Sequence, residues 1–269
     1  MEKRKAEIIE ILKKLLSPRA IVERNDIASR KFEGLPESRG VVFGTLAEST
    51  PIRLNGLKFN IELLGGHKTG YYLDQQVNYE EVARYAKGAN VLDAFCFLGG
   101  FSLHAARAGA THVHGLDQSA EAVAAATENA RENGLQDLSS FEAANVFDWL
   151  KAQTTTAPNE KVVPRYDLII LDPPSFTKNR ASVPDALRGY KEIHLRALKL
   201  LKRTGILATF CCSHHVDAQN FEQVILEAAF DARRVLRKIA TYSQSPDHPI
   251  IPTIPETEYL KGFAFSVAR

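Results

Sequence analysis

From about residue 71 onward, short apolar runs alternate with segments whose apolar residues follow the spacing of a helix. Short apolar runs bounded by glycine, proline or polar residues predict buried strands, and apolar residues three or four positions apart predict amphipathic helices. Strands that alternate with helices are typical of a parallel sheet covered on both faces. The sequence therefore predicts an α/β fold with a doubly wound, mostly parallel sheet, with strands near residues 91–95, 113–116, 139–143, 166–171, 205–211, 234–241 and 263–267.

The first quarter of the chain has a different pattern. Residues 3–16 place apolar side chains on one face of a helix and lysine or glutamate on the other. Short strands are expected near residues 20–22, 41–46 and 52–64, the last run interrupted by an Asn55-Gly56 turn. We therefore expect a small α+β domain at residues 1–70, a candidate for RNA or substrate contact, followed by a catalytic domain at residues 71–269.

The composition excludes several classes of protein. The 269 residues, with a formal net charge of +2, suit one large α/β domain with a small appendage. No apolar run is long enough to span a membrane, and the three cysteines have neither a disulfide nor a zinc spacing. The glycine-rich residues 65–70 lack the spacing of a phosphate-binding loop, which argues against a nucleoside triphosphatase. We expect a cytoplasmic protein with no membrane partner and no metal.

Residues 90–117 form the unit around which the rest of the chain is organised. An apolar strand is followed by the Gly99-Gly100 turn, a helical segment and a second strand that ends at Asp117. In doubly wound sheets such a unit binds a nucleotide, and an acid at the end of the second strand accepts hydrogen bonds from ribose hydroxyls. The dinucleotide pattern Gly-x-Gly-x-x-Gly is absent, so a nucleoside such as S-adenosylmethionine fits better than a dinucleotide. The alternative is that this unit is an ordinary strand-helix-strand crossover that binds no ligand.

Other candidate residues follow the predicted strands. Ligands of open α/β sheets bind beyond the carboxyl ends of the strands, where we expect Asp93, Asp117, Asp172 and Cys212 to converge. The prolines of Asp172-Pro-Pro remove backbone donors and stiffen their loop, so that Asp172 can be held against a planar substrate. The alternative is simply a rigid turn after a strand.

The two adjacent cysteines are distinguished by the alternation of a strand. Most free cysteines are small buried hydrophobic residues, and we expect this of Cys96 and Cys211. Cys212 lies one residue further, on the opposite face, beside His214 and His215. Positive neighbours lower the pKa of a thiol and make it nucleophilic. Cys212 is therefore the candidate nucleophile.

Several motifs in one order resemble the ribosomal RNA large-subunit methyltransferase I (RlmI) family. They are Asp93-Ala-Phe-Cys-Phe-Leu-Gly-Gly-Phe-Ser, Asp172-Pro-Pro-Ser-Phe, Arg188-Gly-Tyr-Lys, Cys212-Ser-His, Asp247-His-Pro, Tyr259-Leu-Lys-Gly-Phe and a junction motif at residues 68–76. The resemblance covers about residue 20 to the end. It implies a seven-stranded class I methyltransferase fold and S-adenosylmethionine-dependent methylation of cytosine at carbon 5 in 23S ribosomal RNA. By the same likeness Cys212 is the nucleophile, and we expect Asp172 to assist at N3 of the base.

The likeness and the strand positions together give the expected contacts. The cofactor is expected to contact Gln75, Asp93, Phe95, Gly99, Gly100, Phe101, Asp117, Gln118, Ser119, Asn145, Val146, Asp172, Pro173 and Pro174. The substrate is expected to contact Lys68, Ser175, Phe176, Arg188, Tyr190, His214 and His248. The expected partner is RNA, and a homodimer is left open.

The chain departs from the family pattern at four points. Family members usually begin with a PUA RNA-binding domain, which we do not expect here. Asn145 stands where an acid often contacts adenine, and Gln76 stands where many members carry arginine. Many cytosine-5 enzymes carry a second cysteine where this chain has Ser175, so another base must release the product.

Two alternatives to cytosine-5 methylation are left open. An Asp-Pro-Pro loop also serves methylation of exocyclic amines or of guanine N7, for which a thiol is not needed. The protein could instead be a non-catalytic RNA-binding factor that keeps the fold. Loss of S-adenosylmethionine binding would indicate the second alternative.

Overall fold

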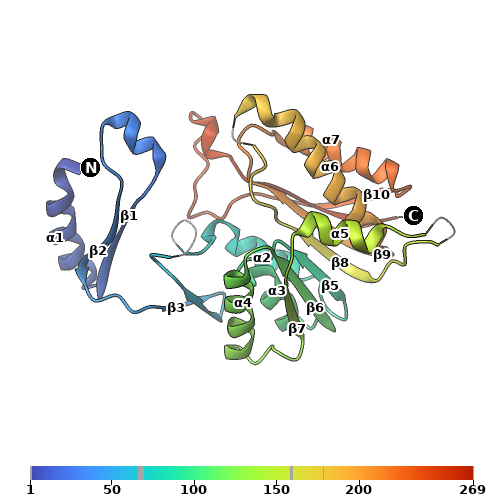
Figure 1. Cartoon of the computed structure of the whole chain (residues 1–269), viewed down its shortest axis with the longest axis horizontal. Helices are drawn as coiled ribbons and strands as arrows, with labels where there is room; N and C mark the ends of the chain where they lie inside the picture. Colours follow the sequence, from blue (N-terminus) through green and yellow to red (C-terminus); the bar gives the residue numbers. More distant parts are fainter. Residues whose placement is uncertain (1, 66–69, 158–159, 178, 269) are drawn as a thin grey trace. The chain divides into compact units, whose positions relative to one another are not determined.

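The computed structural model describes residues 2–65, 70–157, 160–177 and 179–268 (Figure 1). The chain forms two compact units, of which the first comprises Met1–Leu54 and Lys58–Tyr72 and the second Asn55–Leu57 and Leu73–Arg269. The functional division expected at residue 70 stays a prediction.

The described residues before position 66 include an amphipathic helix and two pairs of short strands. Asn55 and Gly56 adopt left-handed backbone angles, with φ of 50° and 83°, which is the geometry expected for a tight Asn-Gly hairpin. The segment after the first strand contains the 3₁₀ helix Ala28–Glu33. The main elements are α1 (Lys5–Leu16), β1 (Ala20–Asn25), β2 (Ser38–Gly44), β3 (Thr50–Leu54) and β4 (Leu57–Ile61).

The second unit is built on a seven-stranded sheet, which confirms the predicted fold class. Its strand order is β10-β11-β9-β8-β5-β6-β7. The five strands β5 to β9 are parallel, and β11 runs antiparallel to both of its neighbours. The strands are β5 (Asn90–Ala94), β6 (His112–Asp117), β7 (Ser139–Ala143), β8 (Tyr166–Leu171), β9 (Leu201–Cys211), β10 (Leu236–Tyr242) and β11 (Lys261–Val267).

Helices cover both faces of this sheet (Figure 1). Alternate residues of each strand point to opposite faces, so Leu92 and Ile169 join the core cluster under α5 to α7, whereas Phe210 stacks on Phe101 of α3. The helices are α2 (Gln76–Ala83), α3 (Gly100–Arg107) and α4 (Ala120–Glu132) on one side, and α5 (Val146–Thr154), α6 (Val183–Leu200) and α7 (Ala218–Asp231) on the other. Within the described residues, no helix is long and apolar enough to cross a membrane.

Helix ends are fixed by the polar residues that precede them. The hydroxyl of Ser119 accepts a hydrogen bond from the Ala122 amide at 3.1 Å and so caps the start of α4. Asn145 caps α5 in the same way through the Phe147 amide at 3.0 Å. Such caps satisfy amide groups that have no partner within the helix.

A fully buried histidine joins α6 to the centre of the sheet. The two ring nitrogens of His194 lie 2.6 Å from the carbonyl of Tyr190 and 2.8 Å from the hydroxyl of Thr209 on β9. Burial lowers the pKa of His194 from 6.5 to about 4, and burial also lowers the pKa of His104 on α3 to about 4. Both imidazoles are therefore neutral in the folded protein at neutral pH.

Acidification should destabilise the protein through these histidines. Between about pH 6.5 and pH 4 the unfolded chain binds protons that the buried rings cannot bind, so the free energy of unfolding falls as the pH falls. At pH 5 we expect His194 alone to account for a loss of about 2 kcal/mol. Urea unfolding of the His194→Gln variant should give a lower stability at neutral pH but a shallower decline toward pH 5. An identical decline in both proteins would contradict the neutral buried ring.

Candidate active site

The predicted strand ends lie at one edge of the sheet. The neighbouring strands β9, β8, β5 and β6 are parallel, so their carboxyl ends coincide. By the alternation of their strands, Asp93, Asp117, Asp172 and Cys212 all belong to the side covered by α3. The structure thus brings together the four residues that the sequence analysis expected to converge.

Asp93 is completely buried and has one unsatisfied oxygen. Its Oδ2 accepts a hydrogen bond of 2.6 Å from the hydroxyl of Ser102 on α3, whereas Oδ1 is buried and has no hydrogen-bond partner among the described residues. Burial raises the pKa of Asp93 to about 7. A buried acceptor without a partner is costly, so this site fits a ligand that brings a donor, such as the amino group of an amino-acid moiety.

The loop after β5 is held in a strained conformation by Asp117. Phe95 and Phe97 have φ values of 70° and 49°, a left-handed backbone that bulky residues rarely adopt. The carboxylate of Asp117 accepts from the Phe97 amide at 3.0 Å and from the Ser119 amide at 2.9 Å. An ionised carboxylate has about four acceptor positions, so it can still accept bonds from two ribose hydroxyls.

Two expected cofactor contacts have a different role in the structure. Gly99 has φ of 85°, a left-handed backbone that favours glycine, and a Cβ at this position would make only ordinary contacts with the surrounding protein atoms. Phe101 is 4% exposed because its ring packs between Phe210 and Tyr79. The ring of Phe101 is a core element and gives no support to the expected cofactor contact.

Asp172 is oriented by a chain of buried amides. The Nε2 of Gln75 donates to Asp172 Oδ1 at 3.0 Å, and Asn78 Nδ2 donates to Gln75 Oε1 at 2.6 Å. Asn78 Nδ2 also lies 2.9 Å from the carbonyl of Ser243. Gln75, expected to contact the cofactor, is only 3% exposed and holds the candidate catalytic carboxylate. Asn78 was not expected at the site, because it carries no motif of its own.

Cys212 meets the Asp-Pro-Pro loop. Its sulfur lies 4.0 Å from the carbonyl of Pro173, and the residue is half-buried, whereas Cys211 is fully buried in the core. The next residue, Ser213, is also fully buried, and its hydroxyl lies 3.0 Å from that of Ser175 and 3.1 Å from that of Tyr190. The two loops that carry the candidate nucleophile and the candidate acid are therefore joined directly.

This geometry agrees with the comparison with protein families. The model of the S-adenosylmethionine-dependent methyltransferases matches residues 35–257. The chain belongs to this family. The membership confirms S-adenosylmethionine as the predicted cofactor.

Individual relatives of this methyltransferase agree. Proteins called ribosomal RNA large subunit methyltransferase I from Tolumonas auensis and Shewanella denitrificans are 40% and 41% identical over 260 and 250 residues. The matches cover 95% and 92% of this chain but only 64% and 62% of the relatives, so the chain spans less than two thirds of their length. These relatives confirm the RlmI resemblance.

The fold recurs in a solved structure. A provisionally assigned S-adenosylmethionine-dependent methyltransferase from Streptococcus mutans superposes with a TM-score of 0.81 at 22% identity. The superposition covers 99% of this chain and 66% of that one, and at this identity it shows the fold alone.

The residues expected to contact the substrate differ in burial and in their contacts. Tyr190, expected to contact the substrate, is fully buried, and it supports Phe176 at a ring distance of 4.6 Å and the hydroxyl of Ser213 at 3.1 Å. His214 is exposed beside Tyr259, with ring centroids 5.6 Å apart. Arg188 is exposed and pairs with Asp185, His248 lies 3.2 Å from Asp247, and Lys68 lies outside the described residues.

The remaining expected cofactor contacts differ in exposure. Gln118, Asn145 and Pro174 are exposed, and Phe95 is half-buried with its ring 6.5 Å from Phe147. Val146 is 2% exposed, and Gly100 and Pro173 are buried. Since the side-chain carbonyl of Asn145 caps α5, its proposed contact with adenine would share that oxygen.

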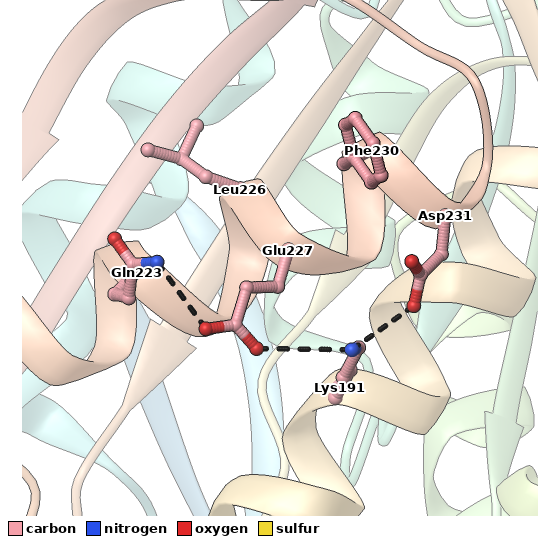
Figure 2. Close-up of a pocket in the computed structure, with 6 residues that line it drawn as sticks. All are labelled: Lys191, Gln223, Leu226, Glu227, Phe230 and Asp231. Carbon is pink, nitrogen blue, oxygen red and sulfur yellow. Dashed lines mark hydrogen bonds and ion pairs between the residues drawn. The ribbon is translucent and has the colours of Figure 1, made fainter.

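A surface hollow of about 430 Å³ lies elsewhere, between α6 and α7 (Figure 2). Lys191 pairs there with Asp231 at 3.0 Å and with Glu227 at 3.7 Å. None of the expected site residues lines this hollow. The part of the chain that the structure describes contains no group of three potential metal ligands.

Replacement of Asp117 by alanine should weaken S-adenosylmethionine binding. The loss of charge-assisted hydrogen bonds to ribose should cost about 1.5–3 kcal/mol, measured by calorimetry. Asp167→Ala is a matched control, because Asp167 also accepts from a backbone amide, that of Asn90 at 2.9 Å, but at the amino end of β8. The control should lose stability and keep its affinity. Equal affinities of wild type and Asp117→Ala would refute the ribose contact.

Proposed function

We propose that this methyltransferase forms 5-methylcytosine in RNA, with large-subunit ribosomal RNA as the substrate. The observation that carries the proposal is the meeting of the Cys212 and Asp172 loops, with the thiol 4.0 Å from the Pro173 carbonyl, at the sheet edge that also carries Asp93 and Asp117. The names of the relatives support ribosomal RNA as the substrate. A ribosomal RNA substrate implies a cytoplasmic location.

The cofactor site is proposed to lie along β5 and β6. Asp93 Oδ1 would accept from the amino group, Asp117 would hold the ribose, and the strained loop at Phe95–Gly99 would pass beneath them. The unsatisfied Asp93 oxygen supports this fit. When bound, S-adenosylmethionine supplies an electrophilic methyl group.

The residue types suit addition of a thiol to the base. Carbon 5 of cytosine is a weak nucleophile until the thiolate of Cys212 bonds to carbon 6, which moves an electron pair toward carbon 5. A hydrogen bond from protonated Asp172 to N3 would assist this step. After carbon 5 accepts the methyl group, a base removes its proton and the carbon–sulfur bond breaks, which returns the thiolate. The target base must be unstacked from its neighbours to reach this edge.

The two adjacent cysteines should differ sharply in activity. Cys212→Ala should abolish formation of 5-methylcytosine in large-subunit ribosomal RNA, while S-adenosylmethionine affinity stays unchanged, because the thiol contacts the base and not the cofactor. Cys211→Ser is the matched control. It should retain activity with reduced stability, since a hydroxyl replaces a fully buried thiol.

Adduct trapping tests the covalent step itself. RNA that contains 5-fluorocytosine should form a denaturant-resistant complex with the wild type, because fluorine cannot leave as a proton. The complex should persist in Cys211→Ser and be absent in Cys212→Ala. The reverse pattern would show that Cys211 is the nucleophile. If both variants methylate RNA at guanine N7 or at an amine, that reaction takes the place of the proposed one.

A further inference from the structure

A half-buried lysine adjoins the loop of the proposed nucleophile. The Nζ of Lys261, at the start of β11, donates to the carbonyl of Ser213 at 2.7 Å and to the carbonyl of Tyr259 at 2.9 Å. Lys261 pairs in register with Cys211, the last residue of β9, which Cys212 follows directly. As described above, the hydroxyl of Ser213 contacts the hydroxyls of Ser175 and Tyr190. Lys261 therefore holds the backbone of Ser213, the residue that follows Cys212.

This cation has no carboxylate partner. Among the described residues, Lys261 makes no ion pair, although the ordinary surface lysines Lys202 and Lys238 lie 2.9 Å and 2.8 Å from carboxylates. Burial lowers the pKa of Lys261, whereas nearby Cys211 and Cys212 in their thiolate forms would raise it. A buried charge is unfavourable without a counter-ion, and a thiolate in this loop would supply one.

The other titratable groups near this loop are poor counter-ions. Burial raises the pKa values of Tyr190 and Tyr259, so both phenols are neutral at physiological pH. Asp217 and Glu258 also act on Lys261, but both are exposed, and Asp217 is engaged in capping α7. The exposed ring of His214 faces Tyr259. Of the acidic groups that act on Lys261, the fully buried Cys211 and the half-buried Cys212 therefore remain as those that can carry the balancing negative charge away from solvent.

We propose that Lys261 is a positioning residue for Cys212, whose ammonium group fixes the thiol-bearing loop through the Ser213 carbonyl and favours the thiolate over the thiol. The role rests on the proposed function, in which that thiolate attacks the base. The histidines that follow Cys212 in sequence are both exposed. The positively charged neighbour of Cys212 is therefore Lys261, near the carboxyl end of the chain.

The test measures the thiol without RNA or methyl transfer. In a Cys211→Ser background, the rate of Cys212 alkylation by iodoacetamide is followed against pH in the full chain. Lys261→Gln, which keeps a hydrogen-bond donor but removes the charge, should raise the midpoint by at least about one pH unit, so that alkylation near pH 7 slows roughly tenfold. Lys261→Arg, which keeps the positive charge, should have the same midpoint as the protein with Lys261. Lys238→Gln, which breaks a surface ion pair on the adjacent strand, should leave it unchanged.

A second measurement separates this inference from the proposed reaction. Methylation by Lys261→Gln should be slow near pH 7 and recover toward pH 9, where the thiol ionises without help, while S-adenosylmethionine affinity and thermal unfolding verify that the variant is folded. An unchanged alkylation midpoint would overturn the role of Lys261, even if Cys212→Ala is inactive. A shifted alkylation midpoint in Lys261→Gln, together with methylation by Cys212→Ala, would support the coupling between Lys261 and Cys212. The same result would overturn the proposed reaction. If Lys261→Gln does not fold, a Lys261→Arg midpoint unlike that of wild type would also count against the inference.

Discussion

Pairing of every backbone amide and carbonyl within the buried parallel strands is the constraint on which this structure depends. β5 and β8 lie at the centre of the sheet, and nearly all of their residues are buried. Side chains along such strands must be apolar, so polar groups gather where the strands end and the backbone leaves the sheet. Parallel strands end at the same edge, which explains why one edge carries the candidate site. Asp93 is the exception, because it lies within β5 and keeps an unsatisfied oxygen there.

The site is assembled by contacts between segments that are far apart in the sequence. The bond from Gln75 to Asp172 joins residues 97 positions apart, and the bond from Tyr259 to Asp74, at 2.8 Å, joins residues 185 positions apart. Ser213 connects α6, β11 and the Asp-Pro-Pro loop through Tyr190, Lys261 and Ser175. The arrangement of this edge therefore depends on contacts between elements that only the complete sheet brings together.

The sequence predicted the parts of this structure that depend on local patterns. Apolar runs located the strands, and Asn55-Gly56 identified the hairpin. The alternation of β9 separated the buried Cys211 from the half-buried Cys212. These features depend on neighbours in sequence, and therefore they are visible without coordinates.

Features that depend on distant partners were missed or misassigned. Lys261 and Asn78 act through residues of other elements, and no local pattern reveals them. Tyr190 is a different case, because a signal was present. It lies four residues after Ala186 and three before Ile193 on α6, the spacing of one helix face, and all three are buried. Helical periodicity would have placed Tyr190 in the core, whereas its motif suggested contact with the substrate.

The left-handed backbone at Phe95 and Phe97 has a consequence for how this sequence can change. Such a conformation costs about 1–3 kcal/mol for a bulky residue, and glycine adopts it with little strain. The carboxylate of Asp117 holds the Phe97 amide in a backbone conformation that phenylalanine disfavours. A population of variants selected for thermal stability alone should therefore drift toward glycine at position 97. A lineage that keeps the aromatic ring there is selected for something other than stability.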